Sequence, residues 1–156
     1  MNGRAKMHER RRMVAGAAIA LALASLSGGA VAATPTIEVW KSPSCGCCAE
    51  WVKHLQANGF AVKVNDSGNT AARARLGVPM KLGSCHTAQV GGYAIEGHVP
   101  AADIKRLLAE QPNAVGLAVP GMPIGSPGME QGNDREPYDV LLVERGGSTR
   151  VYQSHR

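Results

Sequence analysis

The stretch Ser42–Cys48 reads SPSCGCC and holds three of the four cysteines of the chain. Before it, Thr36–Lys41 (TIEVWK) alternates apolar and polar residues and includes β-branched ones, which predicts a strand that Pro43 ends. After the first cysteine, the apolar residues of Cys47–Asn58 fall on one helical face, and Asn58-Gly59 supplies a C-terminal cap. The sequence therefore predicts a strand, a cysteine turn and a helix in direct succession.

The next segments continue this alternation. Phe60–Val64 is a predicted second strand and Thr70–Leu76 a predicted short helix. Strand and helix in alternation favour a βαβ unit whose two strands are parallel. Thr87–Val90 and Tyr93–Glu96 then flank Gly91-Gly92, which predicts a hairpin with a two-residue turn.

The C-terminal part predicts a helix, a loop and a second hairpin. Pro100 opens the helix and Pro112 stops it. Val115–Gly132 is a predicted loop, because its segment PGMPIGSPGM is too rich in Pro and Gly for a helix or a central strand. Tyr138–Glu144 and Thr149–Gln153 predict the final hairpin. The order β-α-β-α-β-β-α resembles a thioredoxin fold. The predicted class is α/β, a mixed sheet flanked by helices, with a Pro/Gly/Met-rich loop and a C-terminal β-hairpin.

Residues 1–32 have the three parts of a cleavable export signal. A basic start precedes the apolar run Met13–Leu26, and Ala30-Val31-Ala32 forms the small-residue end. Cleavage is expected near Ala32, with export to the periplasm by the ordinary route rather than through a twin-arginine signal at Arg10–Arg12. Because the run is shorter than the roughly 20 apolar residues that span a bilayer, no membrane span is expected after cleavage. Residues 33–156 are predicted to form a single domain.

The net charge of +5 arises mainly from this signal. Removing its five Lys/Arg and one Glu from the 17 basic and 12 acidic residues leaves 12 and 11. The basic pI therefore does not indicate a nucleic-acid partner, and an aromatic content of 4% offers no base-stacking platform. The chain shows no paired-carboxylate motif, no Ser-His-Asp pattern and no phosphate-binding glycine loop, so no hydrolase or transferase motif is present.

Cys45 and Cys48 have the C-x-x-C spacing of redox and metal sites. Cys45 precedes the predicted helix and Cys48 lies on its apolar face, so we expect Cys45 to be reachable and Cys48 sheltered. These two residues are the predicted catalytic pair if the site is redox-active. Thiolates at a helix start are stabilised by free amides and by the helix dipole, and they serve as nucleophiles and as metal ligands. The spacing alone does not separate the two roles.

Cys47 and Cys85 favour a metal site. A dithiol exchanger has no need of Cys47, which would compete to form wrong disulfides. In a thioredoxin-like fold the loop before the predicted hairpin lies against the cysteine turn, so Cys85 completes a four-sulfur set. Cysteine together with methionine in an exported protein favours Cu(I), while zinc has little use for methionine. The predicted metal ligands are Cys45, Cys47, Cys48 and Cys85. The auxiliary candidates are Met122, Met129, His86, His98 and Met80.

Simpler structural roles compete with some of these assignments. Cys85 fits a small buried core thiol, because free cysteine packs well inside proteins. Met122 and Met129 fit apolar anchors that tie a loop to the core. His98 fits a capping or packing residue at the entry to a helix. His54 falls on the polar side of the first helix, where a solvated surface histidine is expected.

Four motifs also occur in order along the chain. They are WKSPSCGCC (40–48), SCHTA (84–88), GYAIEGHVP (92–100) and VPGMP with GME (119–123 and 128–130). Together they resemble the CopG-type periplasmic copper-resistance proteins, a family long catalogued as a domain of unknown function, and the resemblance runs from about Ile37 to the final hairpin. It implies a thioredoxin-like fold, a copper site on the four cysteines, and a role in periplasmic copper handling that includes a change of oxidation state.

The leading hypothesis is an exported copper-binding protein that holds Cu(I), including a multinuclear cluster, on cysteine thiolates and interconverts Cu(II) and Cu(I). Its partners are then metal ions and periplasmic efflux or copper-resistance proteins. One alternative is a periplasmic thiol-disulfide oxidoreductase that uses Cys45 and Cys48. Another is a passive carrier that passes copper to an efflux system. Cys47 and Cys85 discriminate among them, because the exchanger needs neither and the cluster needs both.

Overall fold

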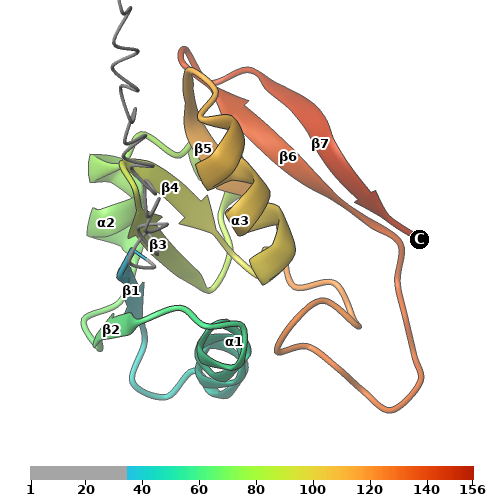
Figure 1. Ribbon diagram of the computed structural model, residues 1–156. Coiled ribbons are helices and arrows are strands. Elements are labelled where there is room, and N and C mark those ends of the chain that lie inside the picture. The colour runs from blue at the N-terminus through green and yellow to red at the C-terminus, as the bar shows by residue number, and fades with distance from the viewer. Residues whose placement is uncertain (1–34) are drawn as a thin grey trace, which may run out of the picture. The chain divides into compact units, whose positions relative to one another are not determined.

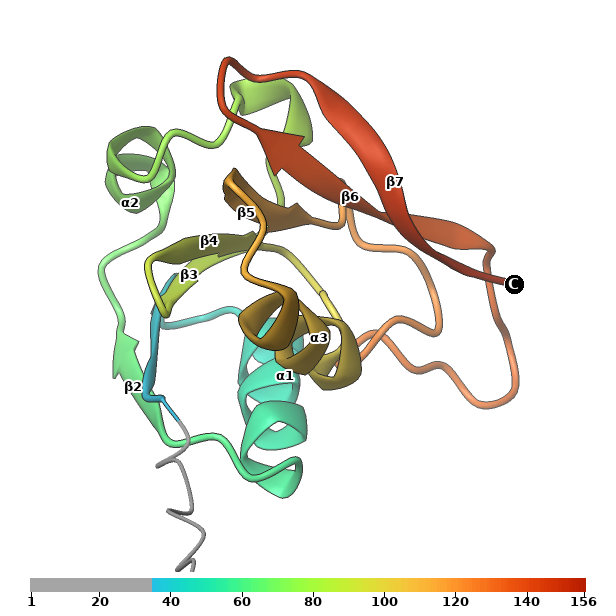
Figure 2. The same ribbon diagram turned by 45° about the horizontal axis from the view of Figure 1, so that its top comes forward.

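The computed structural model describes residues 35–156, which form a seven-stranded sheet with helices on both faces (Figures 1 and 2). The predicted export signal, residues 1–32, lies outside the described residues. The elements are β1 (Ile37–Lys41), α1 (Gly46–Ala57), β2 (Val62–Asn65), α2 (Thr70–Arg75), the 3₁₀ helix η1 (Met80–Leu82), β3 (His86–Val90), β4 (Tyr93–Glu96), α3 (Ala101–Glu110), β5 (Ala114–Ala118), β6 (Tyr138–Glu144) and β7 (Thr149–His155).

The strand order is β2-β1-β3-β4-β5-β6-β7. Strands β1 and β2 are parallel, with Ile37 opposite Val62, which confirms the predicted βαβ unit. Strand β3 is antiparallel to both β1 and β4. The start of β3 therefore lies beside the end of β1, with His86 opposite Lys41. The first four strands and three helices have the thioredoxin-like arrangement that the sequence predicted, and the predicted C-terminal hairpin extends the same sheet.

The prediction of a loop over Val115–Gly132 is wrong at its first residues. Ala114–Ala118 forms strand β5, parallel to β4 and antiparallel to β6. The strand was missed because its sequence, AVGLA, lacks the alternation of a half-buried strand. A Cβ on Gly116 would lie 1.8 Å from the carbonyl oxygen of Ala94. The close approach of the two strands therefore requires a glycine at this position.

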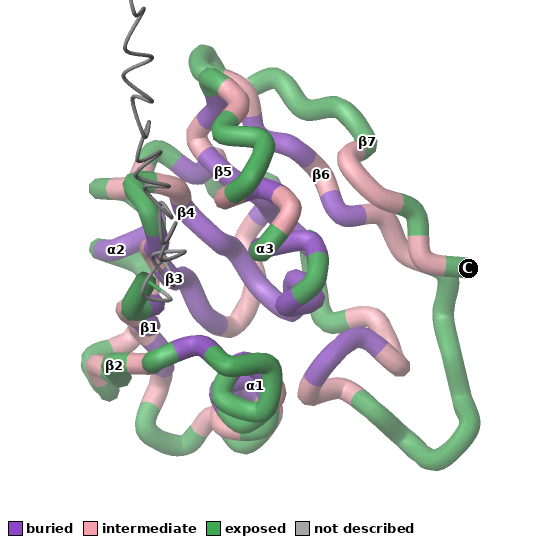
Figure 3. Tube along the Cα trace, in the orientation of Figure 1, coloured by how far each residue is buried: buried purple, intermediate pink, exposed green. Residues whose placement is uncertain are grey.

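The two sheet faces bury two different apolar clusters. Figure 3 shows buried residues along the central strands and on one side of α1 and α3. Helices α1 and α3 cover one face through Trp51, Leu55 and Ile104, which pack on residues of β1, β3, β4, β5 and β6. A smaller cluster on the other face joins Val78 and Leu82 to residues of β4, β5 and β6. Because the main cluster reaches from β1 to β6, the C-terminal hairpin shares the core of the thioredoxin-like part.

Two side chains of α1 join it to the segment that opens α3. Trp51 Nε1 donates to the Val99 carbonyl at 2.9 Å, and His54 Nε2 accepts the amide proton of Ala101 at 3.0 Å. The prediction of a solvated surface His54 is therefore wrong, because this ring satisfies a free amide at the start of α3. Among residues 35–156, no helix has the length and apolar character needed to cross a membrane.

Candidate metal and redox site

The cysteine turn lies between the end of β1 and the first turn of α1. Cys45 is the N-cap residue of α1 and Cys48 sits in its first turn. Their sulfurs form a disulfide, with Cα atoms 5.4 Å apart. Cys48 is fully buried and Cys45 is half-buried, so the expectation of a reachable first cysteine and a sheltered second one is confirmed. Cys47 and Cys85 are free thiols.

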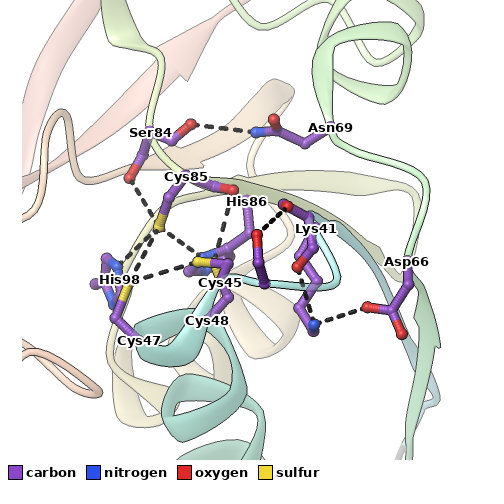
Figure 4. The surroundings of a disulfide bond; sticks show 12 residues. Lys41, Cys45, Cys47, Cys48, Asp66, Asn69, Ser84, Cys85, His86 and His98 are labelled. Atoms are coloured by element: carbon purple, nitrogen blue, oxygen red, sulfur yellow. Dashed lines mark hydrogen bonds and ion pairs between the residues drawn. A yellow bond between two sulfur atoms is a disulfide. The ribbon is translucent and has the colours of Figure 1, made fainter.

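Cys85 reaches this turn from the loop between η1 and β3 (Figure 4). Its sulfur lies 3.8 Å from that of Cys47, which in turn lies 3.5 Å from that of Cys45. The four cysteine sulfurs all lie within 4.8 Å of one another. The structure therefore brings together the four predicted ligands from two segments that are far apart in the sequence.

Two buried imidazoles adjoin Cys85. His98 Nε2 lies 3.1 Å and His86 Nδ1 lies 3.4 Å from the Cys85 sulfur. His98 Nδ1 lies 2.8 Å from the Pro127 carbonyl. Because a carbonyl oxygen only accepts, His98 Nδ1 carries the proton and Nε2 presents its lone pair toward Cys85. Cys85, His86 and His98 form a second group of ligand atoms of the kind that holds a metal ion.

Burial sets the protonation of these groups. Burial, with a smaller contribution from the neighbouring Cys47, raises the pKa of the Cys85 thiol to about 12. Burial lowers the pKa of His86 to about 3, with a smaller contribution from His98, and burial also lowers the pKa of His98. The imidazoles are therefore neutral near pH 7, the form in which histidine binds metals. A bound cation would favour the Cys85 thiolate over the thiol.

A buried ion pair between Arg73 and Glu96 holds the backbone of the loop that carries Cys85. Arg73 donates to Glu96 at 2.9 Å and also to the Ser84 carbonyl, while Glu96 accepts the Ser84 amide at 2.7 Å and the Thr87 hydroxyl at 2.6 Å. Asn69 donates to the Ser84 carbonyl as well. Sequence reasoning missed this network, because Arg73 and Glu96 lie 23 residues apart and share no local motif.

The loop after β5 folds back over the cysteines. Ser84 Oγ donates to the Gly121 carbonyl at 2.6 Å, and the Pro127 carbonyl accepts from His98. Gly128, at φ +85°, lies directly on the start of α1, where an added Cβ would meet the Cys47 carbonyl oxygen at 2.7 Å. The Pro/Gly-rich segment is thus fixed to the site at three points along its length.

The auxiliary candidates differ in where they lie. His86 and His98 are fully buried beside Cys85. Met122 is half-exposed and follows the anchored Gly121, while Met129 is partly buried and follows Gly128. Met80 is 68% exposed, in η1. The structure therefore places the two histidines at the cysteine cluster, and the ligand roles of the three methionines stay predictions.

Sheet order and side-chain cluster together define a thioredoxin-like α/β protein with a four-cysteine site of the soft-metal kind. A profile described as "Protein of unknown function, DUF411" matches residues 82–129. Two solved structures match most of the chain. "Copper resistance protein copG- Form 2" is 47% identical, covers 79% of this chain and 99% of its own, and has a TM-score of 0.74. "Copper resistance protein copG- Form 1" is 48% identical, with 77% and 96% covered and a TM-score of 0.73. No curated protein sequence matches significantly. The chain belongs to the CopG copper-resistance protein family.

Proposed function

We propose that the protein binds copper as Cu(I) on the thiolates of Cys45, Cys47, Cys48 and Cys85 and serves copper resistance. The observation that carries this proposal is the convergence of four sulfurs within 4.8 Å of one another. Thiolates prefer soft ions, and Cu(I) is the softest of the common biological metals. The names of the two similar structures, both copper resistance proteins, support copper over zinc.

In the proposed copper complex, the reduced chain supplies the sulfur ligands. Opening the Cys45–Cys48 bridge frees two sulfurs beside the thiols of Cys47 and Cys85, and thiolates that bridge two ions allow a small multinuclear cluster. His98 Nε2 is an auxiliary donor, because its other nitrogen is already held by the Pro127 carbonyl. Such a second contact fixes the tautomer and ring orientation of a ligating histidine.

Copper is also the redox partner of the Cys45–Cys48 pair in this proposal. Two Cu(II) ions each take one electron from the dithiol, the two thiol protons pass to solvent, and the S–S bond forms. The products are two Cu(I) ions and the disulfide that the structure contains. The protein is then an oxidoreductase of copper ions, rather than a passive carrier that passes Cu(I) to an efflux partner.

An anaerobic Cu(I) titration tests the binding proposal. The number of ions bound and their affinity are measured for the native chain and for Cys47→Ser and Cys85→Ser. We expect each substitution to lower the stoichiometry or to weaken affinity by at least tenfold. Unchanged binding in both variants would exclude the four-sulfur site. Reduction of Cu(II) by the reduced chain, followed with a Cu(I)-selective chromophore, separates the oxidoreductase from a passive carrier.

A thiol-disulfide oxidoreductase is the second candidate function. It is favoured by the Cys45–Cys48 bridge with its half-buried first sulfur at a helix start, where a thiolate is stabilised. Reduction of a model protein disulfide by the dithiol form measures this activity. Activity that survives both Cys47→Ser and Cys85→Ser, with copper binding also unchanged, would select the exchanger.

For the whole chain we propose export to the periplasm, with residues 1–32 removed and residues 33–156 working as one domain. The arrangement of basic, apolar and small residues supports this organisation. N-terminal sequencing of the protein recovered from the periplasmic fraction tests it. An N-terminus at or near Ala33 is expected, and a chain retained intact in the cytoplasm would contradict it.

A further inference from the structure

Cys47 and Cys85 are free while the other two cysteines are bridged, and nothing in the redox step above uses them as electron donors. Their sulfurs lie 3.8 Å apart and come from α1 and from the loop before β3. Both side chains are half-buried. With Cys45 and Cys48 bonded to each other, the only other free thiol in the chain for either of the two is that of its partner, because the sequence has four cysteines.

We infer that Cys47 and Cys85 form a second dithiol–disulfide couple, so that the site stores four electrons rather than two. This inference goes beyond the proposed function, because it concerns the thiols themselves and holds for any oxidant that accepts their electrons. A disulfide needs its sulfurs about 2.05 Å apart, and rotation about χ1 moves a cysteine sulfur without moving its backbone. Because the two sulfurs already lie 3.8 Å apart, rotation of the two side chains is the movement that we expect to close the gap.

The electron balance follows from the two pairs. Each pair loses two protons to solvent and two electrons to the oxidant when its S–S bond forms. With Cu(II) as oxidant, four thiols and four Cu(II) ions give two disulfides, four Cu(I) ions and four protons. Because a disulfide sulfur is no longer a thiolate, the fully oxidised site has lost its soft anionic ligands. Complete oxidation therefore releases Cu(I) from the cysteines.

The two bridges differ in what they constrain. Cys45 and Cys48 are three residues apart, whereas Cys47 and Cys85 are 38 residues apart. A bridge that closes a longer loop restricts the unfolded chain more. The second bridge also ties the start of α1 to the loop that carries Cys85. We therefore expect it to raise the resistance of the fold to denaturant and to be the later of the two bridges to open under a dithiol reductant.

Counting thiols tests the inference with no need of a copper complex. The full chain is reduced, freed of reductant, oxidised with diamide or with Cu(II), and its remaining thiols are counted under denaturing conditions. We expect no thiols in the native chain and one in Cys47→Ser or in Cys85→Ser. With Cu(II) and a Cu(I) chelator, four Cu(I) should form per native chain, and two per chain in either variant. Two thiols left in the oxidised native chain would overturn the inference.

Peptide mapping identifies the bond. Trypsin releases residues 42–53, with three cysteines, and residues 82–105, with Cys85. An intramolecular second bridge joins these two peptides in the non-reduced digest of a monomeric chain. The double variant Cys45→Ser/Cys48→Ser keeps only the Cys47/Cys85 pair, and it should lose both thiols on oxidation. A bond between two chains, or no joined peptide, would overturn the inference, whereas failure of the Cu(I) titration alone would leave the second couple standing and overturn only the copper proposal.

Discussion

Glu96 and Arg73 form the buried ion pair on which the Cys85 loop rests. Glu96 is fully buried, and one of its carboxylate oxygens accepts both the Arg73 guanidinium and the Ser84 amide. Charges removed from water are stable only as a satisfied set, and loss of one partner leaves the other uncompensated. This pair therefore couples the stability of the fold to the placement of Cys85.

The Glu96→Gln variant tests that coupling. Glutamine keeps the shape but removes the charge beside Arg73, so we expect a loss of about 3 kcal/mol in the free energy of unfolding and roughly tenfold weaker Cu(I) binding. Denaturant unfolding and anaerobic Cu(I) titration measure the two effects. The matched control is Glu50→Gln, which removes the exposed partner of Lys53 and should change stability by less than about 0.5 kcal/mol. Equal, small effects in the two variants would contradict this role.

His86 gives the metal-free chain, with the Cys45–Cys48 bridge intact, a specific pH dependence. Burial lowers its pKa to about 3, so the unfolded chain binds this proton at pH 5 while the folded chain does not. Stability is therefore lost as the pH falls below about 6.5, and His86 alone contributes about 2 kcal/mol of loss between pH 7 and pH 5. Denaturant unfolding at the two pH values measures this loss. His86→Phe should remove the share that His86 contributes, while His98, whose pKa burial also lowers, keeps its own share. An unchanged pH difference would show that other groups cause it.

At the level of elements, the loop after β5 is fixed to α1 through Gly128. Its φ of +85° and the contact with the Cys47 carbonyl both require a residue without a Cβ. Gly132 lies further along the same loop, also at positive φ, +56°, and nothing lies near its missing Cβ. Substitutions at the two glycines therefore distinguish the cost of backbone strain alone, at Gly132, from that of strain together with a clash against α1, at Gly128.

Gly128→Ala should lift this loop from the cysteine turn. We expect a loss of about 2 to 3 kcal/mol in the free energy of unfolding, against about 1 kcal/mol for Gly132→Ala, which carries only the backbone strain. The alkylation rate of Cys47 in the reduced chain, followed by mass spectrometry, should rise several-fold in the first variant alone. Similar alkylation rates in the two variants would mean that the loop does not shield Cys47.

At the scale of the whole molecule, local signals predicted most elements. Helix ends and turns are marked by short signals that act within a few residues, such as Asn58-Gly59, Gly91-Gly92 and the prolines flanking α3. Strand β5 escaped prediction because its strand character comes from Gly116 packing on Ala94, which is a contact between strands. The cysteines of the turn were identified because C-x-x-C is a spacing typical of redox and metal sites. Cys85 was then assigned to the site because a thioredoxin-like fold places the loop before β3 against the cysteine turn. Arg73, Glu96 and the bonded His54 were not found, because their roles depend on partners far along the chain.

The sheet extension β5–β7 belongs to the same cooperative unit as the cysteine site. Leu142 in β6 is 2% exposed and lies in the main cluster with Trp51 and Ile104. Both tryptophans of the chain, Trp40 and Trp51, lie in the thioredoxin-like part, so their fluorescence reports the surroundings of β1 and α1, whereas far-UV circular dichroism reports every element. Coincidence of the two signals during unfolding is a test of two-state behaviour.

Leu142→Ala should therefore shift both unfolding curves together, by about 2 to 4 kcal/mol, because the cavity it leaves lies in a core shared from β1 to β6. Val151→Ala in β7 is the matched control, since Val151 is 52% exposed and its truncation should change stability by less than about 0.5 kcal/mol. If the fluorescence curve of Leu142→Ala stayed in place while the circular dichroism curve moved, the extension would be a separate unit. In that case copper binding would survive unfolding of the β6–β7 hairpin. If the core is a single cooperative unit, we expect copper binding to be lost together with the hairpin.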